Sequence, residues 1–206
     1  MALICLGMER SGSTLTWQMS KKILGFSPQK SHGYVGGDDK VVYTYRHPIE
    51  AYHSLSRCFA QIYPVAVGNA YALQRLTAQH QIYKRLVEDQ RAGRPLLLLK
   101  YEDYYHTPCQ RLAEIDKFLH SKSTLSGERS VKILEETSLQ KNIWASRENG
   151  NFGDHNEETG LHGKHIDPVY QGVPGALLGR YGEMNDIGLI SLCEMLDYDP
   201  TTNSSC

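Results

Sequence analysis

The sequence Gly7-Met-Glu-Arg-Ser-Gly-Ser-Thr14 sets the architecture of the N-terminal half of the chain. It follows residues 2–7, a continuous apolar run of the kind that forms a strand buried on both faces of a parallel sheet. Residues 14–24, which come next, have the apolar spacing of an amphipathic helix. At such a junction, successive backbone N–H groups point into one concavity at the helix N-terminus. The stretch therefore predicts a P-loop-like phosphate-binding loop after the first strand.

Segments further along the chain repeat this alternation of strand and helix. Residues 41–45 and 96–99 are rich in β-branched, aromatic or leucine side chains and are interpreted as buried strands. Helices are predicted at residues 49–59, 70–92, 128–136 and 187–196, and from residue 107 onwards. Loops are predicted at residues 100–103 and 149–175, and a disordered tail at residues 201–206. The pattern predicts a single α/β domain over residues 1–200, with a mainly parallel sheet flanked by helices.

The overall composition excludes several classes of protein. A chain of 206 residues, 40% of them hydrophobic, is long enough for one domain with a substantial core. The net charge of −1 argues against general attraction to nucleic acids or membrane surfaces. No segment reaches the ~20 apolar residues of a membrane-spanning helix, and the N-terminus lacks the pattern of a signal peptide. The five cysteines form no CxxC pair, so we expect reduced thiols in a cytoplasmic protein without a metal site.

The predicted loop shares only the skeleton of the nucleotide triphosphatase loop, GxxxxGK[ST]. Ser13 occupies the position of the lysine that reaches the terminal phosphates in those enzymes. The cation of this loop, Arg10, lies three residues earlier, directly before Ser11 and Gly12. A P-loop nucleotide kinase or NTPase is therefore an alternative that lacks its principal cation.

The order Arg10-Ser-Gly-Ser-Thr14 resembles the loop of the PAPS-dependent sulfotransferases, which reads roughly [PR]-[KR]-S-G-[ST]-[ST]. That family transfers a sulfuryl group from 3′-phosphoadenosine 5′-phosphosulfate (PAPS), releases 3′-phosphoadenosine 5′-phosphate (PAP) and needs no metal. The resemblance implies that the loop binds the donor through Arg10, Ser11, Gly12, Ser13 and Thr14. Arg10 would clamp the leaving phosphate and the sulfuryl group electrostatically, because a guanidinium does not readily give up a proton.

A second match follows the predicted strand at 41–45. Arg46 and Ser54 reproduce the spacing Arg-x7-Ser of the family's site for the 3′-phosphate. An arginine at a strand end and a serine on the next helix can grip one phosphate together. Taken alone, an arginine before a proline is common at the start of a helix.

Two further segments resemble the part of the family's site that contacts adenine. Tyr101, in Leu-Leu-Lys-Tyr-Glu-Asp, matches the "YEDL" segment, and an exposed polar strand end is the alternative. Thr137-Ser-Leu139 resembles the start of "TSFxxMxxN", with leucine in place of phenylalanine. The resemblance implies adenine contacts from Tyr101, Thr137 and Leu139. A helix cap at Thr137 or Ser138 is the plainer interpretation.

A late glycine segment matches the family in part. Gly160 and Gly163 have the spacing of "RKGxxGxW", whose basic residues and glycine grip the 3′-phosphate. The two positions before Gly160 hold Glu and Thr instead of Arg and Lys. Either Lys164 or His165 supplies the missing charge, or this loop works differently.

The candidate catalytic base is His32, because Lys30-Ser-His32 resembles the family's "KTH" segment. An imidazole with its usual pKa near 6.5 can accept a proton at neutral pH. Glu9 and Glu50 are alternative bases, and His32 could also be an ordinary loop residue. Lys30 could help to orient the sulfuryl oxygens.

Together these matches predict a sulfotransferase that acts on a hydroxyl or amine of a small-molecule or carbohydrate acceptor, with PAPS as co-substrate. They cover residues 3–54, 96–103 and 137–164 as short motifs in the family's order. Two alternatives from other classes are a non-catalytic PAPS- or PAP-binding protein and the P-loop nucleotide kinase or NTPase. A purely structural α/β domain would require all the ordered matches to be accidental.

Overall fold

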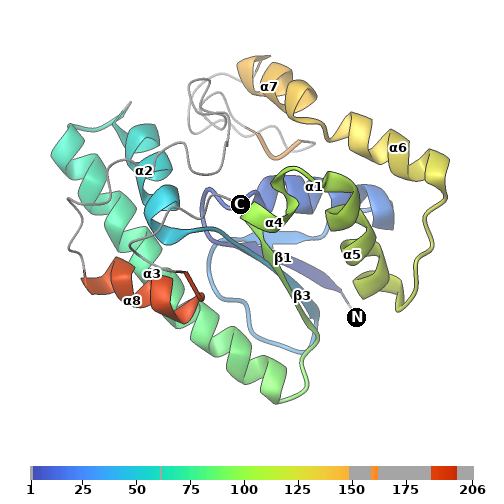
Figure 1. Ribbon diagram of the computed structural model, residues 1–206, viewed down its shortest axis with the longest axis horizontal. Coiled ribbons are helices and arrows are strands. Elements are labelled where there is room, and N and C mark those ends of the chain that lie inside the picture. Colours follow the sequence, from blue (N-terminus) through green and yellow to red (C-terminus); the bar gives the residue numbers. More distant parts are fainter. Residues whose placement is uncertain (1, 61, 149–158, 162–186, 199–206) are drawn as a thin grey trace.

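A parallel sheet with the strand order β2-β1-β3-β4 forms the centre of the computed structural model (Figure 1). The structure describes residues 2–60, 62–148, 159–161 and 187–198. The strands are β1 (Leu3–Gly7), β2 (Gln29–Ser31), β3 (Lys40–Tyr45) and β4 (Leu96–Lys100). Within these ranges, no helix is both long enough and apolar enough to cross a membrane.

Helices cover both faces of the sheet (Figure 1). The helices are α1 (Ser13–Leu24), α2 (Pro48–Phe59), α3 (Val65–Arg91), α4 (Tyr101–Tyr105), α5 (Pro108–His120), α6 (Gly127–Glu136), α7 (Leu139–Glu148) and α8 (Ile187–Met195). Helices α1, α5 and α6 pack on one face, whereas α3 covers the other and in turn supports α2 and α8. This confirms the predicted α/β class, with a parallel sheet between two helical layers.

The strands bury alternate side chains against the two layers. In β1, Leu3 and Cys5 join the core under α1 and α5, whereas Ile4 and Leu6 join the core under α3. All five residues of β1 are buried. Because both faces of the strand are covered, its sequence is continuously apolar and does not alternate with polar residues.

Several boundaries differ from the sequence-based expectation. Strand β2 was not expected, because its three residues are polar and carry no apolar pattern. Residues 100–103 were expected to be a loop, but α4 begins at Tyr101, and the acidic residues in its first turn favour a helix start there. Helix α3 begins five residues before the expected residue 70, directly after Pro64. Helix α7 was also unexpected, and the predicted tail at 201–206 lies outside the described residues.

The carboxyl ends of the strands place the candidate motifs along one edge of the sheet. The predicted loop follows β1, Arg46 follows β3, and α4 follows β4 directly. In an open parallel sheet, ligands bind at this edge. The fold therefore brings three of the sequence motifs to the place where chemistry is expected.

Candidate functional site

The loop between β1 and α1 is held in shape by its own residues. Arg10 and Gly12 adopt left-handed backbone conformations, with φ of 66° and 79°. The buried Ser11 hydroxyl bonds Met8 O, Thr44 O (3.0 Å) and Thr44 Oγ1 (2.8 Å). Its side chain thus ties the loop to β3. Ser11 therefore acts inside the loop, whose backbone is positioned by the neighbouring strand.

Gly7 allows the end of β1 to lie tightly against its surroundings. A Cβ atom at this position would come 2.2 Å from Thr44 Oγ1 and 2.5 Å from Ser13 Cβ. Real Cβ atoms do not approach so closely, so the loop could not keep this path with another residue at position 7. The first glycine of the motif is thus required by packing.

The first and second sequence motifs meet through a hydrogen bond. Arg10 Nε donates to Ser54 Oγ over 2.8 Å, although the two residues are 44 positions apart. Ser54 lies on α2, in the helix that follows β3. Two segments that were matched separately in the sequence are therefore neighbours at one site.

Arg46 is buried and paired with a carboxylate. Its Nε and Nη2 both donate to Glu50 Oε2, the first over 2.9 Å, and both side chains are almost fully buried. The guanidinium also lies 4.5 Å from the ring centre of Tyr101, which places it over the aromatic face. The motif residues Arg46 and Tyr101 are thus in direct contact, and Glu50 is committed to an ion pair.

The candidate base His32 follows β2 and contacts the end of β1. Its Nδ1 lies 2.7 Å from Gly7 O, and its own carbonyl accepts a hydrogen bond from Gln79 Nε2. A carbonyl can only accept, so Nδ1 carries the proton and Nε2 holds the lone pair. Burial lowers the pKa of His32 below its usual value. The ring is therefore neutral at pH 7 and able to accept a proton at Nε2.

Lys30 brings a second cation to the start of α1. Its Nζ donates to Thr14 Oγ1 over 2.7 Å and lies 5.9 Å from the ring centre of Trp17. Burial lowers the pKa of Lys30 to about 8. A Cβ on Gly160, where φ is 68°, would lie 3.4 Å from Lys30 Nζ and 3.2 Å from Trp17 Cζ3. The late glycine segment therefore reaches the first loop through Lys30 and Trp17.

The alternative carboxylate bases are both engaged in ion pairs. Glu9 accepts from Arg75 Nε over 2.7 and 2.8 Å, and Glu50 is held by Arg46. Carboxylate oxygens that already accept hydrogen bonds from a guanidinium are less available to bind an acceptor hydroxyl or amine. Among the candidate bases, His32 has the more suitable environment.

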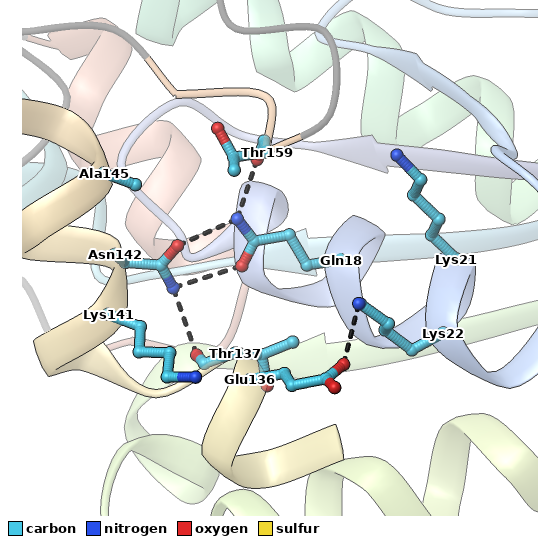
Figure 2. Close-up of a pocket in the computed structure, with 9 residues that line it drawn as sticks. All are labelled: Gln18, Lys21, Lys22, Glu136, Thr137, Lys141, Asn142, Ala145 and Thr159. Atoms are coloured by element: carbon cyan, nitrogen blue, oxygen red, sulfur yellow. Dashed lines mark hydrogen bonds and ion pairs between the residues drawn. The ribbon is translucent and has the colours of Figure 1, made fainter. Parts of the chain in front are cut away.

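A pocket of about 260 Å³ lies between α1 and the segment that joins α6 to α7 (Figure 2). The amides of Gln18 and Asn142 bond each other in both directions, over 2.8 and 3.1 Å. Gln18 Nε2 also donates to Thr159 O, and Asn142 Nδ2 donates to Thr137 O. The rim carries Lys21, Lys22, Glu136, Lys141 and Ala145.

This pocket contains one of the predicted adenine contacts. Thr137 is buried there, and its hydroxyl donates to Ile133 O, as a helix-terminal threonine does. Leu139 begins α7. Gly163 and Lys164 lie outside the described residues. The sequence motifs assigned no role to Gln18 or Asn142. Gln18 stands in no recognisable pattern, and Asn142 ends the matched segment 137–142, in which only Thr137 and Leu139 were given contacts. Within the described ranges, no cluster of side chains could hold a metal ion.

Comparisons with known proteins bear on the fold. No family model matches the chain, and no curated protein does. Among solved structures, the fold is similar to that of mouse sulfotransferase SULT7A1 in complex with PAP, with a TM-score of 0.58 and 12% sequence identity. The match covers 98% of this chain and 84% of the mouse chain. At this identity the likeness shows the fold alone, which is sulfotransferase-like.

Proposed function

We propose that this chain is a sulfotransferase that moves a sulfuryl group from PAPS to a hydroxyl or amine of a small-molecule or carbohydrate acceptor. The observation that carries the proposal is the hydrogen bond from Arg10 to Ser54. It joins two motifs that resemble the same family independently, at the carboxyl edge of a parallel sheet. Such an edge is the usual ligand site of this architecture.

The side chains at this edge suit a ligand with several negative charges. Three cations come to this edge of the sheet, because Arg10 follows β1, Lys30 lies in β2 and Arg46 follows β3. The N-terminus of α1 adds its dipole and backbone N–H groups. In the proposed complex, the α1 loop holds the 5′-phosphosulfate, and Arg46 and Ser54 hold the 3′-phosphate. Tyr101 and Thr137 lie near the adenine ring.

The proposed reaction is an in-line transfer, with PAPS supplying a sulfuryl group on a phosphate leaving group. As the acceptor oxygen or nitrogen bonds to sulfur and the bridging S–O bond breaks, His32 Nε2 takes the acceptor's proton. Arg10 neutralises the charge that develops on the leaving phosphate, and Lys30 assists while it is protonated. Positioning and charge stabilisation account for most of the catalysis in such transfers.

Calorimetric titration with PAP, beside ATP and ADP, tests the donor site. We expect PAP to bind more tightly than either nucleotide, and Arg46→Ala to lose at least about tenfold in PAP affinity, because a charge-assisted contact is removed. The control is Arg91→Ala, at the exposed end of α3, which should bind PAP normally. A preference for ATP would instead support the kinase or NTPase alternative.

Turnover separates an enzyme from a binding protein. Incubation with labelled PAPS and a panel of phenols, sugars and amines should give a labelled product and PAP. His32→Ala should reduce this rate by about 100-fold or more while PAP binding is retained. PAP binding without turnover on any acceptor would favour the non-catalytic binding protein.

A further inference from the structure

Arg111 is a buried cation beside the α1 loop that the sequence motifs do not include. It lies in the first turns of α5, which packs against α1 on one face of the sheet. Only 1% of the residue is exposed. A Cβ on Gly12 would come 3.2 Å from Arg111 Nη1, so the guanidinium reaches the backbone of the loop itself.

Two of the three guanidinium nitrogens of Arg111 make no hydrogen bond within the described part of the protein. Nε and Nη2 are buried and have no hydrogen-bond partner among those residues. The guanidinium lies 5.6 Å from the ring centre of Tyr104, which compensates only part of the lost hydration. Burial lowers the pKa of Arg111 to about 10, so the side chain is still charged at neutral pH. A charge buried in this way destabilises the ligand-free protein.

Arg111 Nη1 lies beside the N-terminus of α1, where Gly12 contributes no side chain. Gly12 precedes the helix and adopts φ of 79°, a conformation that favours glycine. A Cβ there would also meet Tyr101 Cδ2 at 3.2 Å. Because Gly12 has no side chain, Arg111 and Tyr101 can lie close to the loop backbone at this residue.

We propose that Arg111 is a further determinant of anion binding, supplying a fixed positive charge beneath the α1 loop for the phosphosulfate end of the donor. This inference rests on the proposed function and assigns a residue to the same site. Because the charge is shielded from water, it acts on an anion at the loop more strongly than a surface charge would. The loop's N–H groups hold the anion, and Arg111 strengthens that contact as a positioning residue.

A purely structural role for Arg111 predicts a different outcome. A core arginine that only packs on Tyr104 would destabilise the protein when replaced and leave ligand binding unchanged. A buried charge kept for an anionic ligand has the opposite signature. When a neutral side chain of similar length replaces it, the stability of the ligand-free protein is preserved or increased, and the affinity for the ligand falls.

The test compares Arg111→Met and Arg111→Lys with wild type in the full chain, by calorimetric PAP titration and thermal unfolding without ligand. We expect Arg111→Met to weaken PAP binding by about 10- to 100-fold, with an unfolding temperature no lower than that of wild type. Arg111→Lys should keep most of the affinity because it keeps the charge. The matched control is Arg129→Met, since Arg129 Nη2 donates to Lys22 O and Ile23 O at the other end of α1. That variant should lose stability and bind PAP normally.

Unchanged PAP affinity in Arg111→Met would overturn the inference, as would a lower affinity accompanied by a lower unfolding temperature. If Arg111→Met does not fold, Arg111→Gln decides by the same two readouts. If wild type does not bind PAP, the proposed function fails, and inorganic pyrophosphate becomes the probe of the loop. Weaker pyrophosphate binding by the neutral variant than by wild type would then still support the inference. Equal binding, or none to wild type, would overturn it.

Discussion

Helices α1 and α2 follow the adjacent strands β1 and β3 and begin at the same edge of the sheet, yet their N-termini differ in charge. The first turn of α1, which is described throughout, contains no acidic residue, and Lys30 donates to Thr14 there. The first turn of α2 contains Glu50, whose buried carboxylate binds Arg46. Because a helix N-terminus favours a negative charge, α2 carries its own anion and α1 does not.

This difference indicates what each end contributes when a ligand arrives. At α1 a bound anion adds the negative charge that the helix lacks. At α2 the 3′-phosphate must compete with Glu50 for Arg46. We infer that the loop before α1 provides the main binding energy for the phosphosulfate. Arg46 instead selects ligands that carry an anionic group able to displace the Glu50 carboxylate from its guanidinium.

Replacement of the loop arginine should have the largest effect. Arg10→Ala should reduce turnover by about 100- to 1,000-fold, as expected for the loss of one group that stabilises developing charge. Arg46→Ala should act mainly on donor affinity. Steady-state kinetics with varied PAPS separates the two effects, and Arg10→Lys is the control that keeps a positive charge. If Arg10→Ala and Arg46→Ala lost kcat equally, the proposed difference between the N-termini of α1 and α2 would be wrong.

Removing the negative charge of Glu50 should make the N-terminus of α2 bind an added anion as the N-terminus of α1 does. Glu50→Gln should raise PAP affinity by about tenfold, because the phosphate no longer competes with a carboxylate. The ligand-free variant should lose about 3 kcal/mol of stability, because Arg46 becomes a buried unpaired charge. Thermal unfolding with and without saturating PAP should show a larger ligand-induced shift than in wild type. Weaker PAP binding would mean that Glu50 holds Arg46 in place for the ligand.

The pH dependence should reveal the two titrating groups near α1. His32 must be neutral to accept a proton, and burial lowers its pKa, so activity falls only when the pH drops below 6.5. Lys30 must be charged, and its pKa is about 8, so activity falls as the pH rises through that value. Between about pH 7.5 and about pH 9, kcat/KM should fall roughly eightfold.

Lys30→Arg provides the control for the alkaline limb of this profile. Arginine keeps its charge over the whole range, so the fall above about pH 8 should disappear while the acid limb remains. An unchanged alkaline limb in this variant would assign that titration to another group.

The smallest effect is expected at the amide pair in the pocket of Figure 2. Gln18→Ala removes the contacts to Asn142 and Thr159 O, which attach α7 and the late glycine segment to α1. The KM for PAPS should rise about threefold with kcat nearly unchanged, because each such contact contributes about 1 kcal/mol or less. Gln90→Ala is the control, since the Gln90 side-chain amide makes one long contact, 3.4 Å to Leu96 O, among the described residues. A drop in kcat alone would contradict a role in holding the segment.

The parts of the fold that could be predicted are those with a strong local pattern. The strands at 41–45 and 96–99 were recognised because buried parallel strands are apolar throughout. Strand β2 was missed because pairing with β1 defines it, and its own three residues are polar. Helix α7 was missed because residues 139–148 are mainly polar, without the apolar spacing of a packed helix.

The candidate site shows the same limit more sharply. Motif matching selected Arg10 and Ser54 for two different phosphates, and the structure shows that their side chains are in contact. The pairing of Arg46 with Glu50 and the position of Arg111 depend on how α2 and α5 pack, which no local pattern encodes. Sequence reasoning therefore proposed the loop residues and Arg46, but neither the partner of Arg46 nor the buried charge of Arg111.

The peptide between Gly7 and Met8 has a consequence for how this scaffold could evolve. Its carbonyl accepts from His32 Nδ1 over 2.7 Å, and its N–H donates to Thr44 O over 2.9 Å. A peptide unit is planar, so these two bonds fix the imidazole relative to β3 through a single rigid group. Moving the imidazole would break its hydrogen bond to a peptide that is itself held against β3. New substrate preferences should therefore arise by remodelling the surfaces around a stationary histidine.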